Sequence, residues 1–507
     1  MNEGAVAGNV GPGAHMLRGS TWMVGLRWAM RLMGLISTII LARLLTPQDF
    51  GIVAIAMVVV GMFEMLSATG QAAAIIRHRD ATHEHFDTAW TIDILMGLAI
   101  GAAIFLVAPF SKIYFHDDRS VIVLQCLALR PIMSGFENVG LLHFKRELRF
   151  DRLFSYQLYA KLTSFVATVI LAVEMRNYWA LVAGILCGQL ARTVLSYVMH
   201  PYRPHLSFAK MSEIWSFSMW VYVRSMGDYL QGQVDVLAVG GATSAASMGR
   251  YTIAKDVAYS PTNEIVYPTL SVLFPVMARY QHDPKELRQL YVRMLGWALI
   301  IGASTGIGLW LVAPDMVRLV LGQKWVSITP LIGWLAVSAS IEILNDGAYA
   351  TLDVLGIPHL GARLQWARVA VLTAAMFPVA YLTHNLLELV ITRFAIIAIL
   401  ILPVLIVAGR RVGVAPRDYG AAFWRPFTAA GAMALAVLSM NEVLTFTGLP
   451  RLGLDIVLGV VVYLGMLMGL WNISGRPLSA ERDVISLFER GQAVLGIIRA
   501  RVLKTAR

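Results

Sequence analysis

Residues 386–408 read LLELVITRFAIIAILILPVLIVA, an apolar run in which Glu388 and Arg393 are the only charged residues. A bilayer core takes about 20 apolar residues per helix, so this run has the length of a transmembrane helix. Similar runs recur along the 507-residue chain, which is 57% hydrophobic and only 14% charged. That composition differs from soluble domains and predicts an all-α polytopic membrane protein.

The chain contains about fourteen stretches of this kind, and we expect each to form one transmembrane helix. They lie near residues 20–44, 51–75, 87–109, 121–143, 153–173, 178–199, 216–240, 249–276, 292–313, 328–352, 362–382, 386–408, 424–446 and 452–472.

Basic residues concentrate in the even-numbered connections and in the C-terminal tail, which is typical of cytoplasmic segments. The third connection, with Lys112 and Arg119, and the ninth, with Arg318 and Lys324, are exceptions. An even number of spans returns the chain to its starting side, so both termini are predicted to be cytoplasmic. The net charge of +11 then reflects orientation and contact with membrane lipids rather than nucleic-acid binding.

The first twelve spans divide into two halves of six. Residues 50–56 (FGIVAIA) open the second span and residues 248–254 (MGRYTIA) open the eighth, so that Gly, Ile and Ala recur in register. Six is an even number, so both halves insert with the same orientation, as parallel repeats. We therefore expect a flexible cytoplasmic tail (1–18), an N-terminal six-helix lobe (19–205), a C-terminal six-helix lobe (206–410), two additional transmembrane helices (411–472) and a basic cytoplasmic tail (473–507).

Three segments resemble the polysaccharide transporter family. They are residues 42–51 (ARLLTPQDFG), residues 144–150 (FKRELRF), and Leu273-Phe274-Pro275 with Asp283-Pro284. Over roughly residues 19–410 the chain resembles Wzx-type flippases of the multidrug/oligosaccharidyl-lipid/polysaccharide exporter superfamily.

The resemblance implies translocation of an undecaprenyl-diphosphate-linked oligosaccharide across the bacterial inner membrane, for lipopolysaccharide or exopolysaccharide biosynthesis. It also implies two six-helix lobes in a V around a central cavity, lined largely by the first, second, seventh and eighth spans. A polysaccharide polymerase and export machinery are expected partners.

Charged residues within spans need a partner, water or a function, because each costs about 2.5–3.5 kcal/mol at the centre of a membrane helix. Arg27 and Arg31 share one face of the first span at i and i+4, and arginine forks suit a diphosphate. The competing interpretation is that they extend to the cytoplasmic surface. Glu64 is a lone carboxylate in the second span and a candidate partner for an arginine of the first or seventh span.

The seventh span carries a polar stripe of Arg224, Asp228, Gln231 and Asp235, within about 60° on a helical wheel. An internal pair of Arg224 with Asp228 is the structural alternative. Asp235 has no basic residue at i±4, so we consider it for ion coupling.

The eighth span carries Lys255 and Asp256, which point about 100° apart. We expect the substrate-binding cavity to be lined by Arg27, Arg31, Glu64, Arg224, Asp228, Gln231, Lys255 and Asp256. The tenth span carries Glu342 and Asp346, for which structural packing and transport are equally good interpretations. We expect Arg130 and Glu137 to hold helices together.

The sequence predicts a lipid-linked oligosaccharide flippase rather than an enzyme. No phosphate-binding Gly-rich motif is present, and no cofactor or metal site is expected; the run His116-Asp117-Asp118 has no second ligand cluster. An ion-coupled multidrug/cation antiporter of the same superfamily is the alternative, although Arg27, Arg31 and Arg224 favour an anionic substrate. A membrane-embedded glycan polymerase is a more distant alternative, which the short connections disfavour.

Overall fold

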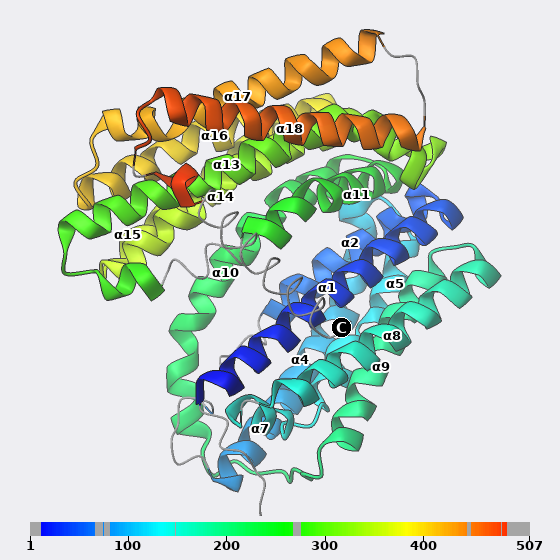
Figure 1. Cartoon of the computed structure of the whole chain (residues 1–507). Coiled ribbons are helices and arrows are strands. Elements are labelled where there is room, and N and C mark those ends of the chain that lie inside the picture. The colour runs from blue at the N-terminus through cyan, green and yellow to red at the C-terminus, as the bar shows by residue number, and fades with distance from the viewer. Residues whose placement is uncertain are drawn as a thin grey trace, which may run out of the picture. The chain divides into compact units, whose positions relative to one another are not determined.

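The computed structural model describes the backbone of residues 12–65, 75, 82–147, 149–266, 275–443, 448–477 and 479–483. Side chains in these ranges are described except those of residues 12–27, 150, 212–225, 228, 265 and 266. Every regular element in these ranges is a helix (Figure 1). The chain divides into two compact units, Met1–Arg250 and Tyr251–Arg507.

In the first unit, α8 packs between α1 and α9, while α4 packs against the short helices α5 and α6. Helix α2 contacts α4, α5 and α10. The helices of this unit are α1 (Pro12–Leu44), α2 (Pro47–Glu64), α4 (His83–Phe115), α5 (Arg119–Leu127), α6 (Leu129–Gly135), α7 (Leu141–Arg146), α8 (Phe150–Met175), α9 (Trp179–Met199) and α10 (Met211–Ala242). Helix α11 (Ala245–Pro261) begins here and continues into the second unit, followed by the π-turn η2 (Thr262–Val266).

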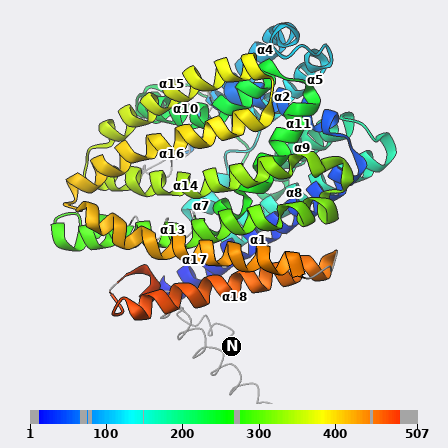
Figure 2. The same cartoon turned by 90° about the horizontal axis from the view of Figure 1, so that it is seen from above.

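In the second unit, α14 lies between α13 and α16, α15 packs on α16, and the pair α17–α18 covers α13, as Figure 2 shows from above. The core between α13, α14 and α16 buries residues such as Tyr291, Leu295, Ile343 and Leu405. The elements are α13 (Pro284–Met316), η3 (Val317–Leu321), η4 (Gln323–Ile328), α14 (Thr329–Val354), α15 (Pro358–Thr383), α16 (Leu386–Arg411), α17 (Pro416–Val443) and α18 (Leu449–Ile473).

The helices confirm the all-α polytopic membrane fold. Within the described residues, ten helices are long and apolar enough to cross a membrane, and each matches one predicted span. The other four predicted spans correspond to α1, to α5, α6 and the start of α7, to α10 and to α11. Large apolar side chains face outward, including Leu106 at 72% exposure, Leu382 at 82% and Val461 at 63%, as expected of surfaces that meet lipid.

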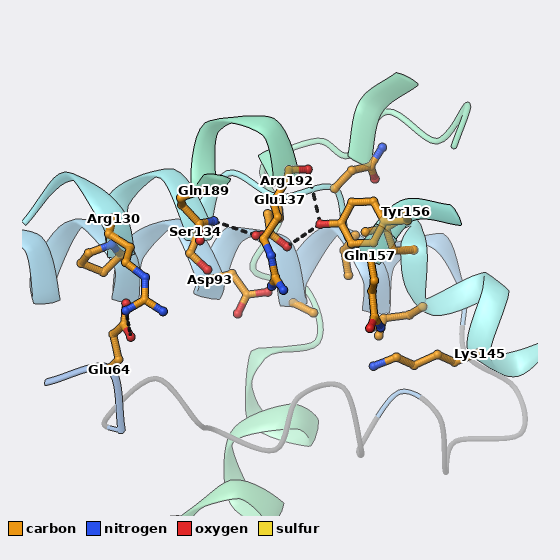
Figure 3. Close-up of a pocket in the computed structure, with 18 of the residues that line it drawn as sticks. Glu64, Asp93, Arg130, Ser134, Glu137, Lys145, Tyr156, Gln157, Gln189 and Arg192 are labelled. Atoms are coloured by element: carbon orange, nitrogen blue, oxygen red, sulfur yellow. Dashed lines mark hydrogen bonds and ion pairs between the residues drawn. The ribbon is translucent and has the colours of Figure 1, made fainter. Parts of the chain in front are cut away.

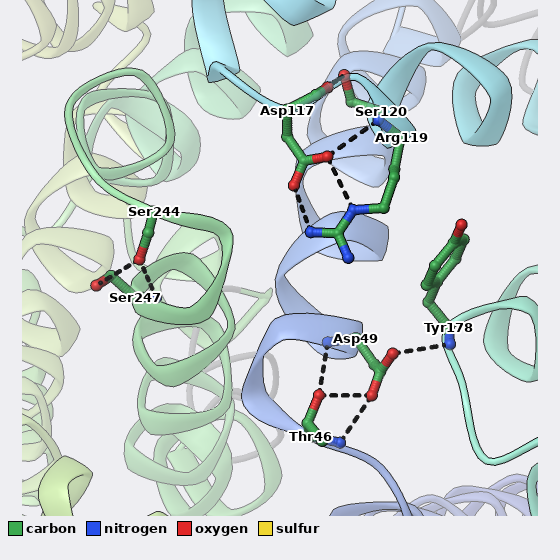
Figure 4. Close-up of polar contacts among 8 residues, drawn as sticks. All are labelled: Thr46, Asp49, Asp117, Arg119, Ser120, Tyr178, Ser244 and Ser247. Carbon is green, nitrogen blue, oxygen red and sulfur yellow. Dashed lines mark hydrogen bonds and ion pairs between the residues drawn. The ribbon is translucent and has the colours of Figure 1, made fainter.

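The first of the three segments that resemble the transporter family, residues 42–51, covers the end of α1 and the start of α2 (Figure 4). Thr46 and Asp49 make a reciprocal capping box: the Asp49 N–H donates to Thr46 Oγ1 at 3.3 Å, and the Thr46 N–H donates to Asp49 Oδ2 at 2.9 Å. Asp49 Oδ1 also accepts from the Tyr178 N–H at 3.0 Å, just before α9. One carboxylate therefore fixes the start of α2 and the connection from α8 to α9.

The starts of α2 and α11, which carry the recurring Gly, Ile and Ala of the predicted repeat, have similar local structure. Ser244 caps α11 as Thr46 caps α2, because its Oγ accepts from the Ser247 N–H at 3.3 Å (Figure 4). A glycine follows each cap five positions later, Gly51 and Gly249. A Cβ on Gly51 would lie 1.6 Å from Ala245 O, and one on Gly249 would lie 1.8 Å from Pro47 O. The two glycines therefore permit a close approach of the helices that a side chain would prevent.

The predicted span at 121–143 is wrong as one continuous helix. It consists of α5, α6 and α7, and α5 ends at Leu127 with a break at Ala128. Pro131 lacks an N–H, so the Leu127 carbonyl has no helical donor, and the proline ring disfavours a continuous helix.

Three expected boundaries differ from the structure. Helix α1 begins at Pro12, inside the predicted tail 1–18. The chain divides into its two compact units after Arg250, whereas the predicted lobe boundary is at 205/206. That boundary lies in the linker between α9 and α10, which is bound to α4 because the Tyr202 hydroxyl donates to Asp87 Oδ1 at 2.6 Å. Residues 479–483, placed by the sequence in a basic tail, include the buried Ala480 and Glu481.

Candidate functional site

The predicted anion-binding arginines lie on one continuous helix. Arg27 and Arg31 both belong to α1, which keeps them on one face at i and i+4. Arg31 is half-buried; the side chain of Arg27 lies outside the described residues. Their role toward a substrate stays a prediction.

The predicted polar stripe lies on α10. The side chains of Arg224 and Asp228 lie outside the described part, but the C-terminal half of the stripe is described. Gln231 Oε1 is buried without a hydrogen-bond partner among the described residues. Asp235 is 4% exposed, and its Oδ1 accepts from the Val236 N–H at 2.9 Å. The stripe thus keeps polar groups inside the protein.

Helix α10 contacts α2 at Tyr229, within the stretch of α10 that carries the stripe. The Tyr229 hydroxyl donates to the Val58 carbonyl at 3.1 Å, and a Cβ on Gly61 would lie 2.2 Å from that hydroxyl oxygen. The contact agrees with the expectation that the second and seventh spans are neighbours.

Lys255 and Asp256 follow one another on α11 in the second unit. Asp256 is exposed, whereas Lys255 is half-buried and lies close enough to Glu342 of α14 for a favourable charge interaction. Their assignment to a transport cavity stays a prediction.

Glu342 is the centre of a buried charged cluster. Its Oε1 accepts from Arg368 Nη2 at 2.8 Å and from Arg393 Nη2 at 3.1 Å, and its Oε2 accepts from the Tyr259 hydroxyl at 2.7 Å. The two arginines are 3% and 5% exposed. These contacts join α11, α14, α15 and α16, which supports the structural interpretation of Glu342.

A polar cavity of about 720 Å³ lies within the first unit (Figure 3). Its volume is in the range of small-molecule sites, about 300–1,000 Å³. Ionisable and amide side chains from α2, α4, α6, α7, α8 and α9, and from the segment between α6 and α7, line it. They include Glu64, Asp93, Arg130, Glu137, Lys145, Tyr156, Gln157, Gln189 and Arg192.

Two carboxylates in this cavity have fixed partners. Glu64 forms an ion pair with Arg130, at 3.0 Å between Oε2 and Nη1. Glu137 accepts from Gln189 Nε2 at 2.7 Å and from the Tyr156 hydroxyl at 3.1 Å. The prediction that Arg130 and Glu137 hold helices together is therefore confirmed. A partner for Glu64 from the first or seventh span stays a prediction.

Glycines bring α4 and α6 close enough to form one wall of the cavity. A Cβ on Gly135 would lie 2.5 Å from the Asp93 carbonyl oxygen, and one on Gly97 would lie 2.5 Å from the Pro131 carbonyl oxygen. This approach places Asp93 near Glu137, so that the two carboxylates interact unfavourably when both are charged.

The sequence interpretation missed Asp93, Gln189 and Arg192. The criterion that selected Glu64, a charge inside an apolar span, applies equally to Asp93 in the third span and Arg192 in the sixth. The predicted site residues lie on the first, second, seventh and eighth spans, which the family resemblance implies line the cavity. Three basic and three acidic side chains among the lining residues make the cavity suitable for solvating a polar, hydroxyl-rich group.

Ten helices among the described residues are long and apolar enough to cross a membrane, which defines a polytopic membrane fold. A family model described as "Polysaccharide biosynthesis protein" matches residues 40–330, more than half of the chain. The chain therefore belongs to this family of polysaccharide biosynthesis proteins.

Two relatives are similar to this chain over most of its length. An uncharacterised membrane protein in the cps region of Klebsiella pneumoniae is 26% identical over 350 residues, which cover 68% of this chain and 72% of that protein. The lipopolysaccharide biosynthesis protein WzxC of Escherichia coli (strain K12) is 26% identical over 322 residues, which cover 62% of this chain and 65% of that protein.

Solved structures share the fold at low sequence identity. The lipid II flippase MurJ, in an inward closed conformation, matches with a TM-score of 0.71 and 11% identity, over 89% of this chain and 99% of that one. An inward-facing multidrug transporter of the MATE family matches with a TM-score of 0.62 and 14% identity, over 76% of this chain and 94% of that one. The chain is thus a multi-pass membrane protein of this polysaccharide biosynthesis family, and it shares its fold with these two transporters.

Proposed function

We propose that this protein is a flippase that moves an undecaprenyl-diphosphate-linked oligosaccharide across the bacterial inner membrane by alternating access. The family match over residues 40–330 is the observation that carries the proposal. Both termini are placed on the cytoplasmic side, as the positions of the basic connections predict. A polysaccharide polymerase and export machinery would receive the product.

The physical problem is to move a glycan and a diphosphate through about 30 Å of hydrocarbon. Charged and amide side chains along the path replace the water that these groups lose. Arg31 and Arg27 on α1 would receive the diphosphate, because a guanidinium can donate two hydrogen bonds to one phosphate group. The polar cavity of the first unit supports the proposal, because its donors and acceptors match sugar hydroxyls.

Asp235 is proposed as the coupling residue. It is buried in α10, where a charge is costly, so uptake or release of a proton there would change the relative stability of two conformations. Asp235→Asn imitates the protonated form. Reconstituted transport by this variant should lose its response to a pH gradient while substrate binding persists; transport that still follows the gradient would exclude Asp235.

Arg31 gives the direct test of the anion site. Arg31→Ala should impair glycan export at normal membrane abundance, and Arg31→Lys should restore part of it, since the charge returns without the fork. Arg152→Ala, at an exposed basic position at the start of α8, is the control and should export normally. Normal export by Arg31→Ala at matched protein level would contradict the assignment.

A further inference from the structure

The linker between α9 and α10, residues 200–210, is bound along the start of α4. The Tyr202 hydroxyl donates to Asp87 Oδ1. Helix α10 begins at Met211, directly after the linker, so these contacts fix the position from which α10 starts. Three backbone N–H groups of the linker also donate to side chains of α4: His205 to Asp87 Oδ1 at 3.1 Å, Ser207 to Thr91 Oγ1 at 2.9 Å and Lys210 to Thr88 Oγ1 at 3.3 Å.

Histidine rings surround the first residues of this linker. His200 opens it, and its ring stacks parallel on that of His143 in α7, with 5.4 Å between the ring centroids. His143 stacks in turn on Phe86 of α4 at 4.3 Å. The His83 ring stacks on the Tyr202 ring at 5.6 Å. The start of α4, α7 and the linker therefore share one aromatic cluster, at the end of the first unit that holds α7 (Figure 1).

The hydrogen bonding of His200 requires a neutral ring. Its Nδ1 accepts from the Tyr202 N–H at 3.2 Å. A protonated imidazole carries hydrogen on both ring nitrogens, so it cannot accept this bond. A Cβ on Gly140 would lie 2.4 Å from the same nitrogen, so the ring lies directly against the backbone before α7. Protonation of His200 would therefore bring two N–H groups face to face.

The surroundings of His200 also disfavour its positive charge. Burial lowers the pKa of His200 below the ordinary value of about 6.5, and His143 lowers it further. Glu147 acts in the opposite direction, and Arg203 adds to the lowering. The other titratable and charged groups near the cluster are His83 and Asp87 of α4, Arg146 of α7 and His205 of the linker.

The sign of the pH dependence follows from this lowered pKa. The bound linker takes up a proton at His200 less readily than a released linker does. The bound form is therefore fully stable above a pH of about 6.5 and weakens as the pH falls below it. The second, fourth and sixth connections meet at this cluster, and all three are predicted to be cytoplasmic, so the relevant pH is that of the cytoplasm.

We propose that His200 is a pH switch that releases the linker from α4 when the cytoplasm becomes acidic. A proton on its ring removes the bond from the Tyr202 N–H and places a positive charge beside His143. Without this first anchor, the linker loses the contacts with Asp87 that follow it, and the start of α10 is released. The proposal does not depend on which substrate is transported.

Hydrogen–deuterium exchange of the purified full-length protein in nanodiscs tests the switch. Peptides that cover residues 200–210 should lose protection from about pH 8 to about pH 5, the range in which histidine changes charge. Exchange rates are corrected for the intrinsic pH dependence of the chemical step. Uptake of one proton permits at most about a tenfold loss of protection per pH unit. Peptides from the core around Leu295 of α13 should keep their protection and thereby exclude general unfolding.

His200→Asn separates the switch from the fold. An asparagine side chain can accept from the N–H two residues on, as His200 Nδ1 does, but it takes up no proton. This variant should stay protected at about pH 8 and should no longer lose protection at about pH 5. His359→Asn, at an exposed histidine of α15, is the matched control and should lose protection as the unchanged protein does.

Three results would overturn the proposal. Constant protection of residues 200–210 in the unchanged protein would exclude a switch, whatever the variants do. Equal loss of protection in His200→Asn would assign the titration to another group. Asp87→Asn keeps an acceptor for the linker and should retain the pH dependence; its disappearance there would assign the switch to Asp87.

His143→Phe decides the question if His200→Asn is already unprotected at about pH 8. Phenylalanine preserves the stack on Phe86 but no longer opposes a charge on His200. Release of residues 200–210 should then begin at a higher pH than in the unchanged protein. Release at the same pH would contradict the role of His200.

Discussion

Glu342 shows how a single buried carboxylate organises part of the second unit. It accepts from two arginines and a tyrosine on three other helices. Its two guanidinium partners are almost fully buried, so each loses a charge partner that water cannot replace when this carboxylate is removed. Removing the carboxylate is therefore more damaging than the loss of one hydrogen bond.

Glu342→Ala is expected to destabilise the protein by about 3–5 kcal/mol, because it removes a carboxylate partner from two buried guanidinium groups. Thermal or denaturant unfolding of the purified protein in detergent measures the loss. Glu442→Ala is the control: this residue is exposed near the end of α17 and should change stability by less than about 0.5 kcal/mol. Equal losses of stability from the two substitutions would contradict the role of Glu342 in stabilising the buried charged cluster.

Charged residues inside spans could be found from the sequence, but their partners could not. Glu64 stands out in an apolar run, yet its ion pair with Arg130 depends on how α2 lies against the broken α5–α6 segment. The contact of Glu481 with Arg425 likewise depends on the turn after α18. Such pairs join positions that are far apart in the chain. Hydrophobic periodicity indicates only which residues share a face of one helix, so it does not predict these pairs.

At the scale of helices, the apolar runs predicted most positions well, because lipid requires long apolar segments. The break at Ala128 was not predicted, since proline is tolerated in membrane helices and Pro131 lies in an otherwise apolar stretch. Arg130 of α6 and Glu137, which follows α6, both line the cavity of the first unit. Hydropathy alone does not distinguish a continuous helix from a broken one.

Asp49 is expected to stabilise the start of α2 and the connection before α9 together. Asp49→Ala removes its hydrogen bonds to Thr46 and Tyr178 and should cost about 1–3 kcal/mol. The melting temperature of the purified protein measures this loss. Gln48→Ala, at the exposed neighbouring position, should melt as the unchanged protein does; a similar loss there would show that Asp49 has no special role.

Gly51→Ala tests the close approach of α2 and α11. In an open helix, alanine stabilises by about 0.5–1 kcal/mol relative to glycine. At Gly51 the added Cβ would lie 1.6 Å from Ala245 O, so the helices must separate and stability should fall. Gly34→Ala, with nothing within 4 Å of the added Cβ, is the control and should not destabilise. Higher melting temperatures for both variants would contradict the observed helix contact.

At the scale of the whole molecule, the sequence predicted the helical membrane fold and the family, both of which are confirmed. The predicted lobe boundary differs from the division of the chain after Arg250, because packing of α10 on α2 and α4 assigns that helix to the first unit. Hydropathy and repeat spacing give the order of helices along the chain. They do not record which neighbours each helix contacts.

The orientation in the membrane follows from the basic connections and can be measured. Single cysteines placed at Arg149 and Arg417, both at exposed positions in even-numbered connections, should react with a membrane-impermeant thiol reagent only from the cytoplasmic side. A cysteine at the exposed Arg176, in the fifth connection, should react from the outside of intact cells. Reaction of the first two positions from outside would reverse the predicted topology.

Reconstituted translocation tests the proposed function most directly. The full-length protein is placed in proteoliposomes with a fluorescently labelled undecaprenyl-diphosphate-linked oligosaccharide, and an impermeant quencher reports which leaflet carries the label. The proposal predicts that labelled lipid in the inner leaflet becomes quenchable much faster than in protein-free liposomes, and that Arg31→Ala slows this exchange. Exchange at the protein-free rate, combined with transport of small cationic compounds, would contradict the proposal and favour a multidrug antiporter.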